Sequence, residues 1–317
     1  MTVLVTGATG VIGSHLVRAL KERGEDVVVT IYTEPKGRFL SETLDAVKIV
    51  SMDIRDYSHM LEVVSRYGVD EIYHLAALAK VAAAQKDPMN TYRTNVMGTV
   101  SVLEAARQCD VKKVLVMLTD KVYGNRREAT ENSPVNYSEP YSTSKACQRL
   151  VTESYMETYG MDIVLPHSCN VFGYDPFSSR IFPNVIKKCL RGKAPAIFTK
   201  DKSVREYIYV EDLVVALLKL MGPRKRSSEG YHGVYNISTG WVHTNEQIVL
   251  KILDTFPNLH PVYTTRDNLP KQIDITTMKS IRKEFVWGPT WSMDEAIDST
   301  VAQFIRYKDD WGLKEVK

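Results

Sequence analysis

Two side chains near the middle of the chain have the types and spacing needed for proton transfer at an alcohol. Tyr141 and Lys145 lie four residues apart at the start of a predicted helix over residues 141–159, so they share one face of it. A free tyrosine has a pKa near ~10, and a neighbouring ammonium lowers that pKa by favouring the phenolate. Tyr141 is therefore predicted to exchange a proton with a substrate hydroxyl beside a hydride-accepting cofactor.

Three polar residues follow an apolar run at residues 111–118 that is typical of a buried parallel strand. Thr119, Asp120 and Lys121 supply a hydroxyl, a carboxylate and an ammonium in succession. Catalytic groups in parallel sheets gather at the carboxyl ends of the strands, so these residues are candidates for an acid and a base. A strand that simply leaves the core through polar residues would give the same pattern.

A glycine-rich turn, VTGATGVIGSHL, joins a predicted strand at residues 2–6 to a predicted helix at 12–23. Gly7, Gly10 and Gly13 allow a tight turn and a close approach of the backbone to a pyrophosphate, and the start of the helix offers free N–H groups. This position between the first strand and the first helix predicts a dinucleotide site.

The residues after the second predicted strand, 26–32, bear on which dinucleotide binds. NAD-binding turns usually place an acidic residue at the end of this strand, where it holds the ribose hydroxyls. This chain has Ile31 there, and Lys36 and Arg38 follow. Two cations suit the 2′-phosphate of NADP, so NADP is favoured over NAD. Glu34 could still reach the ribose, and NAD therefore stays open.

The elements that would position these groups alternate between helix and strand through residue 165. Apolar strand patterns occur at residues 2–6, 26–32, 47–53, 70–77, 111–118 and 162–166. This alternation predicts an α/β fold, with a doubly wound parallel sheet of Rossmann type over residues 1–165. A looser pattern follows, and it predicts a smaller mixed α/β substrate domain over residues 166–317, with some segments returning to the first domain.

Bulk composition excludes several classes of protein. The 317 residues are 44% hydrophobic and 25% charged, and 41 basic and 38 acidic residues give a net charge of +3. This balance argues against nucleic acid or an anionic membrane as a partner, and no apolar run approaches the ~18 residues of a membrane span. The four cysteines lack metal-ligand spacing, so no metal site is expected. A first strand predicted from residue 2 or 3 leaves no room for a signal peptide, and we expect a cytoplasmic protein.

Together these motifs resemble the extended short-chain dehydrogenases/reductases, in particular the NAD(P)-dependent nucleotide-sugar epimerase/dehydratase family. The similarity covers nearly the whole chain, in the segments TGATGVIG, HLAA (74–77), NVMGTVSVLEAA (95–106), TDKVYG, YSTSK, NVFG (170–173) and REYIYVEDLV (205–214). It implies a tightly bound, recycled NADP or NAD and a nucleotide-diphosphate sugar as substrate. Besides Lys36 and Arg38, the cofactor-binding residues that it implies are Gly7, Gly10, Val11, Ile12, Gly13, Asp53, Ile54, Leu75, Ala76, Ala77, Asn95, Tyr141 and Lys145.

The resemblance also implies roles within the site. Thr119 would help hold the substrate hydroxyl beside the catalytic tyrosine, and Asn95 would fix the active-site backbone and a water. Asn170 and Arg205 match positions that contact the diphosphate, for which a guanidinium fork is suited. Arg180 is a further candidate for this contact, and a surface residue at a helix N-terminus is the equal alternative.

Asp120 and Lys121 decide which reaction the resemblance implies. A 4,6-dehydratase needs an acid and a base near C5 and C6 of the sugar, beyond the Thr, Tyr and Lys that oxidise C4, and these two residues stand where dehydratases carry that pair. The Asp-Lys form resembles CDP-glucose and inverting UDP-N-acetylglucosamine 4,6-dehydratases. A nucleotide-sugar 4,6-dehydratase is therefore favoured. A 4-epimerase is the main alternative, followed by a 4-reductase or decarboxylase and then by a non-catalytic NADP-binding sensor.

Two predicted helices, 88–108 and 141–159, carry more apolar residues than one buried face needs. These residues include Val100, Val102, Leu103, Leu150, Val151 and Tyr155. The resemblance implies a homodimer formed through a four-helix bundle of these helices. Burial within the monomer would explain the same residues.

Overall fold

A computed structural model describes residues 1–124, 128–136, 138–201, 203–222, 233–265, 277–278 and 287–312. Its main sheet consists of β1 (Thr2–Thr6), β2 (Asp26–Ile31), β3 (Lys48–Ser51), β4 (Glu71–His74), β5 (Lys113–Val116), β6 (Leu118–Thr119), β8 (Ile163–Ser168) and β12 (Val234–Ile237). The strand order is β12-β8-β5-β4-β1-β2-β3, and β6 extends the line of β5 beside β8. All of these pairings are parallel, which confirms the predicted doubly wound sheet.

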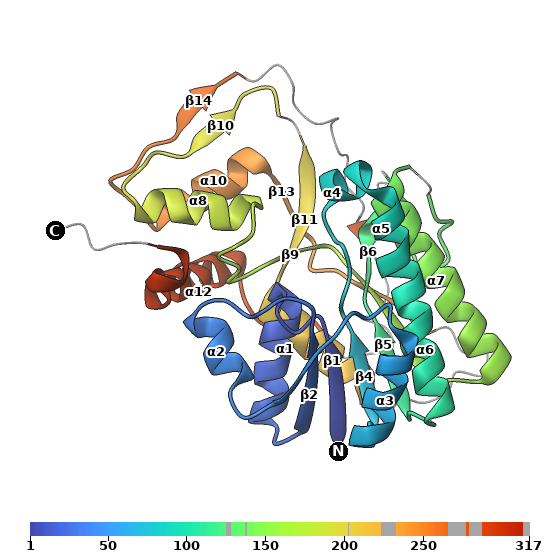
Figure 1. The fold of residues 1–317 in the computed structure, drawn as a ribbon. Coiled ribbons are helices and arrows are strands. Elements are labelled where there is room, and N and C mark those ends of the chain that lie inside the picture. Colours follow the sequence, from blue (N-terminus) through green and yellow to red (C-terminus); the bar gives the residue numbers. More distant parts are fainter. Residues whose placement is uncertain are drawn as a thin grey trace.

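Helices cover both faces of this sheet (Figure 1). One face carries α1 (Val11–Glu22), α2 (Arg38–Leu44) and α9 (Val210–Met221). The other carries α3 (Tyr57–Tyr67), α5 (Pro88–Tyr92), the π-helical η1 (Arg93–Met97), α6 (Gly98–Gln108) and α7 (Pro140–Tyr159), with α4 (Val81–Lys86) against α7. Successive strand residues point to opposite faces, so Val3 and Val5 enter one core and Leu4 enters the other.

A smaller set of elements lies beyond the carboxyl ends of the main strands (Figure 1). It contains a sheet of β9 (Asn170–Phe172), β11 (Val204–Tyr209) and β13 (Trp241–Thr244), a parallel pair of β10 (Ala196–Phe198) and β14 (Val262–Thr264), and the helices α8 (Ile181–Leu190), α10 (Asn245–Asp254), α12 (Met293–Arg306) and η3 (Lys308–Trp311). A further short pair joins β7 (Glu128–Ala129) to β15 (Thr277–Met278). This arrangement agrees with the expected smaller mixed α/β part.

The chain crosses between the two parts more than once. β8 runs to Ser168, past the predicted boundary at residue 165, and β12 pairs with it in parallel register. α9 packs on α1 and on β5 and β8. Later segments thus contribute a strand to the main sheet and a helix to its face.

Local differences from the predicted elements occur at functional positions. The predicted helix over 88–108 contains the π-helical turn η1 around Asn95, and the predicted strand over 111–118 breaks at Met117. That break frees the Met117 carbonyl to accept a hydrogen bond from Lys145 at 2.9 Å. Helix α2 has no counterpart among the predicted elements.

Candidate active site

The glycine-rich turn between β1 and α1 is shaped to receive a dinucleotide. Gly7 has a φ of +73°, and a Cβ there would lie 2.7 Å from the Ala76 nitrogen. A Cβ on Gly13 would collide with the Gly7 carbonyl group. Helix α1 follows Gly10 without a side-chain cap, so N–H groups of its first turn are available to phosphate oxygens. The turn therefore fits a pyrophosphate held against bare backbone.

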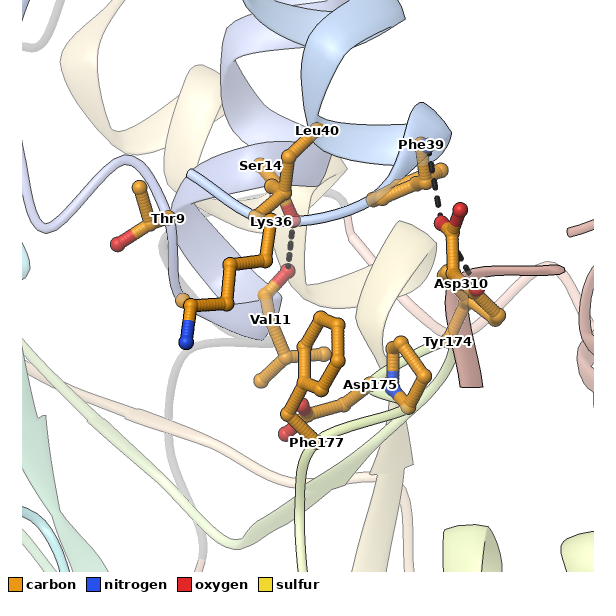
Figure 2. A pocket seen from close by; sticks show the side chains of 12 residues that line it. Thr9, Val11, Ser14, Lys36, Phe39, Leu40, Tyr174, Asp175, Phe177 and Asp310 are labelled. Atoms are coloured by element: carbon orange, nitrogen blue, oxygen red, sulfur yellow. Dashed lines mark hydrogen bonds between the residues drawn. The ribbon is translucent and has the colours of Figure 1, made fainter. Parts of the chain in front are cut away.

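Two adjoining clefts start at this turn and share Val11 and Asp175 in their linings. Lys36 and Phe177 line the first cleft, and Arg180 lines the second. Figure 2 shows the side chains of Lys36, Asp175 and Phe177 around Val11. Burial raises the pKa of Asp175. A groove with a cation in each part suits a ligand that carries several phosphate charges.

Two residues expected at the cofactor, Arg38 and Asp53, are engaged by other parts of the protein. The Arg38 guanidinium donates to the Arg306 carbonyl oxygen at 2.9 Å and lies 5.0 Å from the centre of the Tyr307 ring. Its charge is thus directed to the C-terminal segment and not to the cleft. Asp53 accepts a hydrogen bond from Arg55 at 2.8 Å, and that contact lowers the pKa of Asp53. Of the two cations that favoured NADP over NAD, Arg38 is therefore not directed toward the cofactor cleft.

The turn after β4 forms the opposite side of the glycine-rich loop. The backbone nitrogens of Leu75 and Ala76 each donate to the Thr6 hydroxyl at 3.2 Å, and Ala77 follows them. Ile54 is only 7% exposed, so its side chain belongs to the core of the sheet. These residues shape the floor of the predicted cofactor site through their backbone positions.

Thr119, Asp120 and Lys121 form one connected group at the end of β6. The Thr119 hydroxyl donates to Oδ1 of Asp120 at 2.9 Å, and Nζ of Lys121 donates to Oδ2 at 3.1 Å. Asp120 is 5% exposed, whereas the Lys121 side chain is 29% exposed. Asp120 and Lys121 open the short 3-10 helix η2 (Asp120–Tyr123). Thr119 precedes this helix, and its hydroxyl caps the first turn by accepting from the Lys121 nitrogen. The predicted acid and base are therefore in direct contact.

Tyr141 lies in the first turn of α7 and is 8% exposed. Burial raises the pKa of its hydroxyl to about 12, and the Asp120 carboxylate acts in the same direction. The charge of Arg180 and a hydrogen bond with Thr119 act to lower this pKa. Where the spacing predicted that Lys145 would lower this pKa, Nζ of Lys145 donates to Met117 and Gln148 instead. Tyr141 is brought together with Thr119, Asp120 and Arg180.

Lys145 ends a chain of buried hydrogen bonds that no sequence motif had indicated. Its Nζ donates to the Met117 carbonyl at 2.9 Å and to Oε1 of Gln148 at 2.7 Å. Nε2 of Gln148 donates to the Thr99 hydroxyl at 2.8 Å, and that hydroxyl lies 3.0 Å from Nε2 of His74. Burial lowers the pKa of Lys145 to about 7 and that of His74 to about 3. His74 is therefore a neutral member of this series of hydrogen bonds. The series holds the Lys145 ammonium in place through Met117 and Gln148.

Asn95 is fully buried and ties η1 to two other segments. Its Oδ1 accepts from the Leu78 nitrogen at 2.8 Å, and its Nδ2 donates to the Ser144 hydroxyl at 2.9 Å. Asn95 thereby holds the backbone at Leu78 against the first turns of α7. The π-helical turn η1 carries Asn95, and such turns are frequent at functional sites.

The residues expected at the diphosphate differ in their surroundings. Nδ2 of Asn170 donates to the Glu206 carbonyl at 2.9 Å, and Nη1 of Arg205 donates to Oδ1 of Asn245 at 2.9 Å. Arg180 lines the second cleft and is close enough to Tyr141 to affect its pKa. Of these three residues, Arg180 is therefore the one whose charge acts on Tyr141.

A buried acid near the site had not been expected. Glu206 is 2% exposed, and its Oε1 accepts from the backbone nitrogens of Thr239 at 3.0 Å and Gly240 at 2.8 Å. Burial raises the pKa of Glu206, and the charge of Asp120 adds to that rise. Glu206 follows Arg205 directly in the segment REYIYVEDLV, and this position could have drawn attention to it. The segment alone, however, does not indicate that the carboxylate is buried.

Among the described residues, no group of three or more His, Cys, Asp or Glu side chains is arranged to hold a metal ion. Within the same part of the chain, no helix has the length and apolar character needed to cross a membrane.

The fold and the site define a Rossmann-type enzyme that uses a dinucleotide. A family model described as the NAD dependent epimerase/dehydratase family matches residues 3–238. The chain belongs to this family.

Curated relatives and solved structures are similar to most of the chain. The low-salt glycan biosynthesis protein Agl12 of Haloferax volcanii is 31% identical over 96% of this chain and 99% of its own. The dTDP-glucose 4,6-dehydratase 1 of Escherichia coli is 32% identical over 82% of this chain and 78% of its own. The structure of UDP-glucose 4-epimerase from Thermotoga maritima with UDP-glucose matches with a TM-score of 0.86 and 28% identity, over 96% of this chain and 99% of that one. That of the dTDP-glucose 4,6-dehydratase from Streptomyces venezuelae with NAD bound matches with a TM-score of 0.84 and 27% identity, over 98% and 99%.

Proposed function

We propose that this protein is a nucleotide-sugar 4,6-dehydratase. The observation that carries the proposal is the contact between Asp120 and Lys121, at 3.1 Å, directly beside Thr119 and the buried Tyr141. A 4,6-dehydratase needs an acid and a base close to each other, because it removes a proton from C5 and a hydroxyl from the adjacent C6. Relatives named dTDP-glucose 4,6-dehydratase, at 26 to 32% identity, support the same choice.

The first step uses the groups that dehydratases and epimerases share. Thr119 and Tyr141 would hold the C4 hydroxyl of the sugar, and Tyr141 would take its proton as C4 is oxidised. The nicotinamide, when bound, supplies hydride acceptance at C4 and hydride return at the end of the cycle. Lys145, one turn after Tyr141 on α7, is held by Met117 and Gln148 and would support the cofactor side of the site.

The second step follows from the contact between the acid and the base. Transfer of one proton from the Lys121 ammonium to the Asp120 carboxylate gives a neutral amine and a carboxylic acid within the same hydrogen bond. The amine then takes the C5 proton, which the C4 ketone has acidified. The carboxylic acid gives its proton to the departing C6 hydroxyl, which leaves as water. The pair returns to its charged form, and Lys121 can give a proton back to C5 when hydride reaches C6. The proton that Tyr141 took from the C4 hydroxyl then passes to the neutral amine of Lys121, which restores the starting protonation of all three groups.

The substrate would be bound through its diphosphate. Arg180 lines the cleft next to the glycine-rich turn, and Arg205 and Asn170 lie in the adjoining sheet. A planar guanidinium matches two phosphate oxygens at once, so Arg180 is the main candidate.

A 4-epimerase is the second candidate. It needs Thr119, Tyr141 and the cofactor but neither the acid nor the base at C5 and C6. The match to UDP-glucose 4-epimerase from Thermotoga maritima favours it. Under this alternative, Asp120 and Lys121 would only stabilise the end of β6.

We propose NAD as the resident cofactor, in place of the preference for NADP that Lys36 and Arg38 had suggested. Arg38 is engaged with Arg306 and Tyr307, which leaves Lys36 as the only one of the two in the cleft. Solved structures of Streptomyces venezuelae and Thermus thermophilus relatives contain NAD. NAD and NADP titrations of the purified protein test this choice.

We also propose a homodimer through α5 to α7. Val102 and Leu103 are fully buried within the monomer, so they do not contribute to such an interface. Met97 and Leu150 are 54% and 52% exposed on the outer side of these helices. Large exposed apolar side chains on neighbouring helices are typical of a subunit contact.

Mass spectrometry of the products tests the proposed reaction. The holoenzyme is incubated in turn with UDP-, dTDP-, GDP- and CDP-linked glucose and N-acetylglucosamine. A dehydratase gives a product lighter by one water with one of these substrates. A product of unchanged mass, with NMR couplings that report inversion at C4, would establish the epimerase instead.

A further inference from the structure

We propose that Asp310, near the C-terminus, is a positioning residue for the bound dinucleotide. It fixes both the turn that carries Lys36 and the segment that carries Phe177, and thereby slows release of the cofactor. This inference rests on the dinucleotide site and not on the choice between dehydratase and epimerase.

Asp310 caps a helix that lies far away in the sequence. Its Oδ1 accepts from the Arg38 backbone nitrogen at 2.6 Å, and its Oδ2 accepts from the Phe39 nitrogen at 3.0 Å. Arg38 and Asp310 are 272 residues apart in the chain. Helix α2 begins after Gly37, which offers no side-chain cap of its own. The carboxylate therefore takes the place that an N-cap side chain would normally fill.

The turn at Gly37 is built around this carboxylate. Gly37 has a φ of +88°, and a Cβ there would lie 2.6 Å from Cγ of Asp310. Only a glycine combines this backbone conformation with room for the aspartate. Lys36 precedes this glycine directly and lines the cleft beside Gly10, so the position of Asp310 sets the position of Lys36.

Asp310 also holds the other wall of the cleft. The Tyr174 hydroxyl donates to Oδ2 of Asp310 at 3.2 Å and lies 3.3 Å from the Tyr307 carbonyl oxygen. Tyr174 is followed by Asp175 and by Phe177, both of which line the cleft. Figure 2 shows Asp310 with dashed contacts toward Phe39 and Tyr174, at the side of the cleft away from Thr9.

Aromatic packing makes this junction rigid. The ring of Phe39 lies 4.9 Å from that of Tyr174 and 5.2 Å from that of Tyr307, both edge-on. The ring of Tyr174 also meets that of Phe304 at 4.9 Å. The three segments that meet at Asp310 therefore pack directly on one another, and this links the C-terminal segment to the cofactor cleft.

Retention of the cofactor is a requirement of the chemistry. The hydride that leaves the sugar must return to the same molecule, so a dinucleotide that escapes in mid-cycle ends the turnover. A hydrogen bond to a charged group contributes enough to change an equilibrium by about ten-fold or more. Loss of the carboxylate would release both walls and speed escape of the dinucleotide by about that factor.

Exchange of the bound cofactor tests this inference directly. Holoenzyme is mixed with an excess of the fluorescent analogue etheno-NAD, and the rate of replacement is measured without any sugar. Asp310→Ala is expected to exchange about ten-fold faster than the unaltered protein. The matched control is Asp309→Ala, which removes an exposed carboxylate from the same short helix and should leave the rate unchanged.

Tyr174→Phe keeps the test decisive if Asp310→Ala does not fold. It removes one hydroxyl and retains the ring, and a several-fold faster exchange is expected. Exchange at the unaltered rate in Tyr174→Phe and in any folded Asp310→Ala, even with a lower melting temperature, would overturn the inference, since Asp310 would then only stabilise the fold. Failure of every sugar substrate to react would overturn the proposed dehydratase while leaving this result standing.

Discussion

Nζ of Lys121 lies 3.1 Å from Oδ2 of Asp120, and the other oxygen of that carboxylate accepts the Thr119 hydroxyl at 2.9 Å. The candidate base and the candidate acid of an elimination thus share one hydrogen bond. The same group touches the hydroxyl that would hold the substrate alcohol. An ammonium in such a pair cannot accept a proton until it has given one away, so the neutral form of the pair is the reactive one.

The first prediction is that cofactor reduction and water loss can be abolished separately. Asp120→Asn and Lys121→Ala should lower the rate of water loss by about 10²- to 10⁴-fold, because each removes one proton-transfer group. Reduction of the bound cofactor in a single turnover should persist in both variants. The comparison variant is Tyr141→Phe, which should stop both steps and keep the cofactor bound. Equal loss of cofactor reduction and water loss in Asp120→Asn would contradict the assigned roles.

The second prediction is that two substitutions shift the pH profile of cofactor reduction in opposite directions. The pKa of Tyr141 is raised to about 12 by burial, with the Asp120 charge adding to the rise and the Arg180 charge opposing it. The phenolate is the basic form, so cofactor reduction should rise with pH toward this pKa. Asp120→Asn removes an anion and should move the profile to lower pH. Arg180→Gln removes a cation and should move it to higher pH.

Single-turnover cofactor reduction at saturating substrate measures both profiles. Arg191→Gln is the matched control, because Arg191 is an exposed arginine of α8's C-terminal end that stacks on Trp311. Its profile should match that of the unaltered protein. Shifts in the same direction for Asp120→Asn and Arg180→Gln would show that these charges do not act on Tyr141.

Local sequence patterns were sufficient for much of the fold and for the centre of the site. The glycine turn at Gly7 to Gly13 needs its residue types for backbone reasons, and Tyr141 and Lys145 share a helix face by spacing alone. The strand ends were also correct to within a few residues. These features depend on neighbours in the chain, and neighbours can be read from the sequence.

Features that depend on distant residues could not be predicted. The capping of α2 by Asp310 and the partners of Lys145 join segments that the fold alone brings together. The raised pKa of Tyr141 has the same origin, because burial and the Asp120 charge outweigh what the spacing to Lys145 had suggested. Arg38 illustrates the limit most directly, since its charge faces Tyr307 rather than the cofactor cleft.

Disruption of a subunit contact is the third prediction. Met97→Glu and Leu150→Glu place charges on exposed apolar positions of η1 and α7, and a charge buried in an interface is costly without a partner. Both variants should be monomers by light scattering where the unaltered protein is a dimer. Leu250→Glu is the matched control, because Leu250 is 40% exposed on α10, outside this surface. Dimers in all three variants would exclude α5 to α7 as the interface.

Reaction in D₂O tests the central claim most directly. Proton removal at C5 by Lys121 requires that the proton later delivered to C5 comes from a group that exchanges with solvent, and the Lys121 side chain is 29% exposed. The account predicts a product that has lost one water and carries deuterium at C5 in most molecules, as read by NMR and mass spectrometry. A product inverted at C4 with no deuterium at C5 would contradict it and establish that Asp120 and Lys121 perform no elimination.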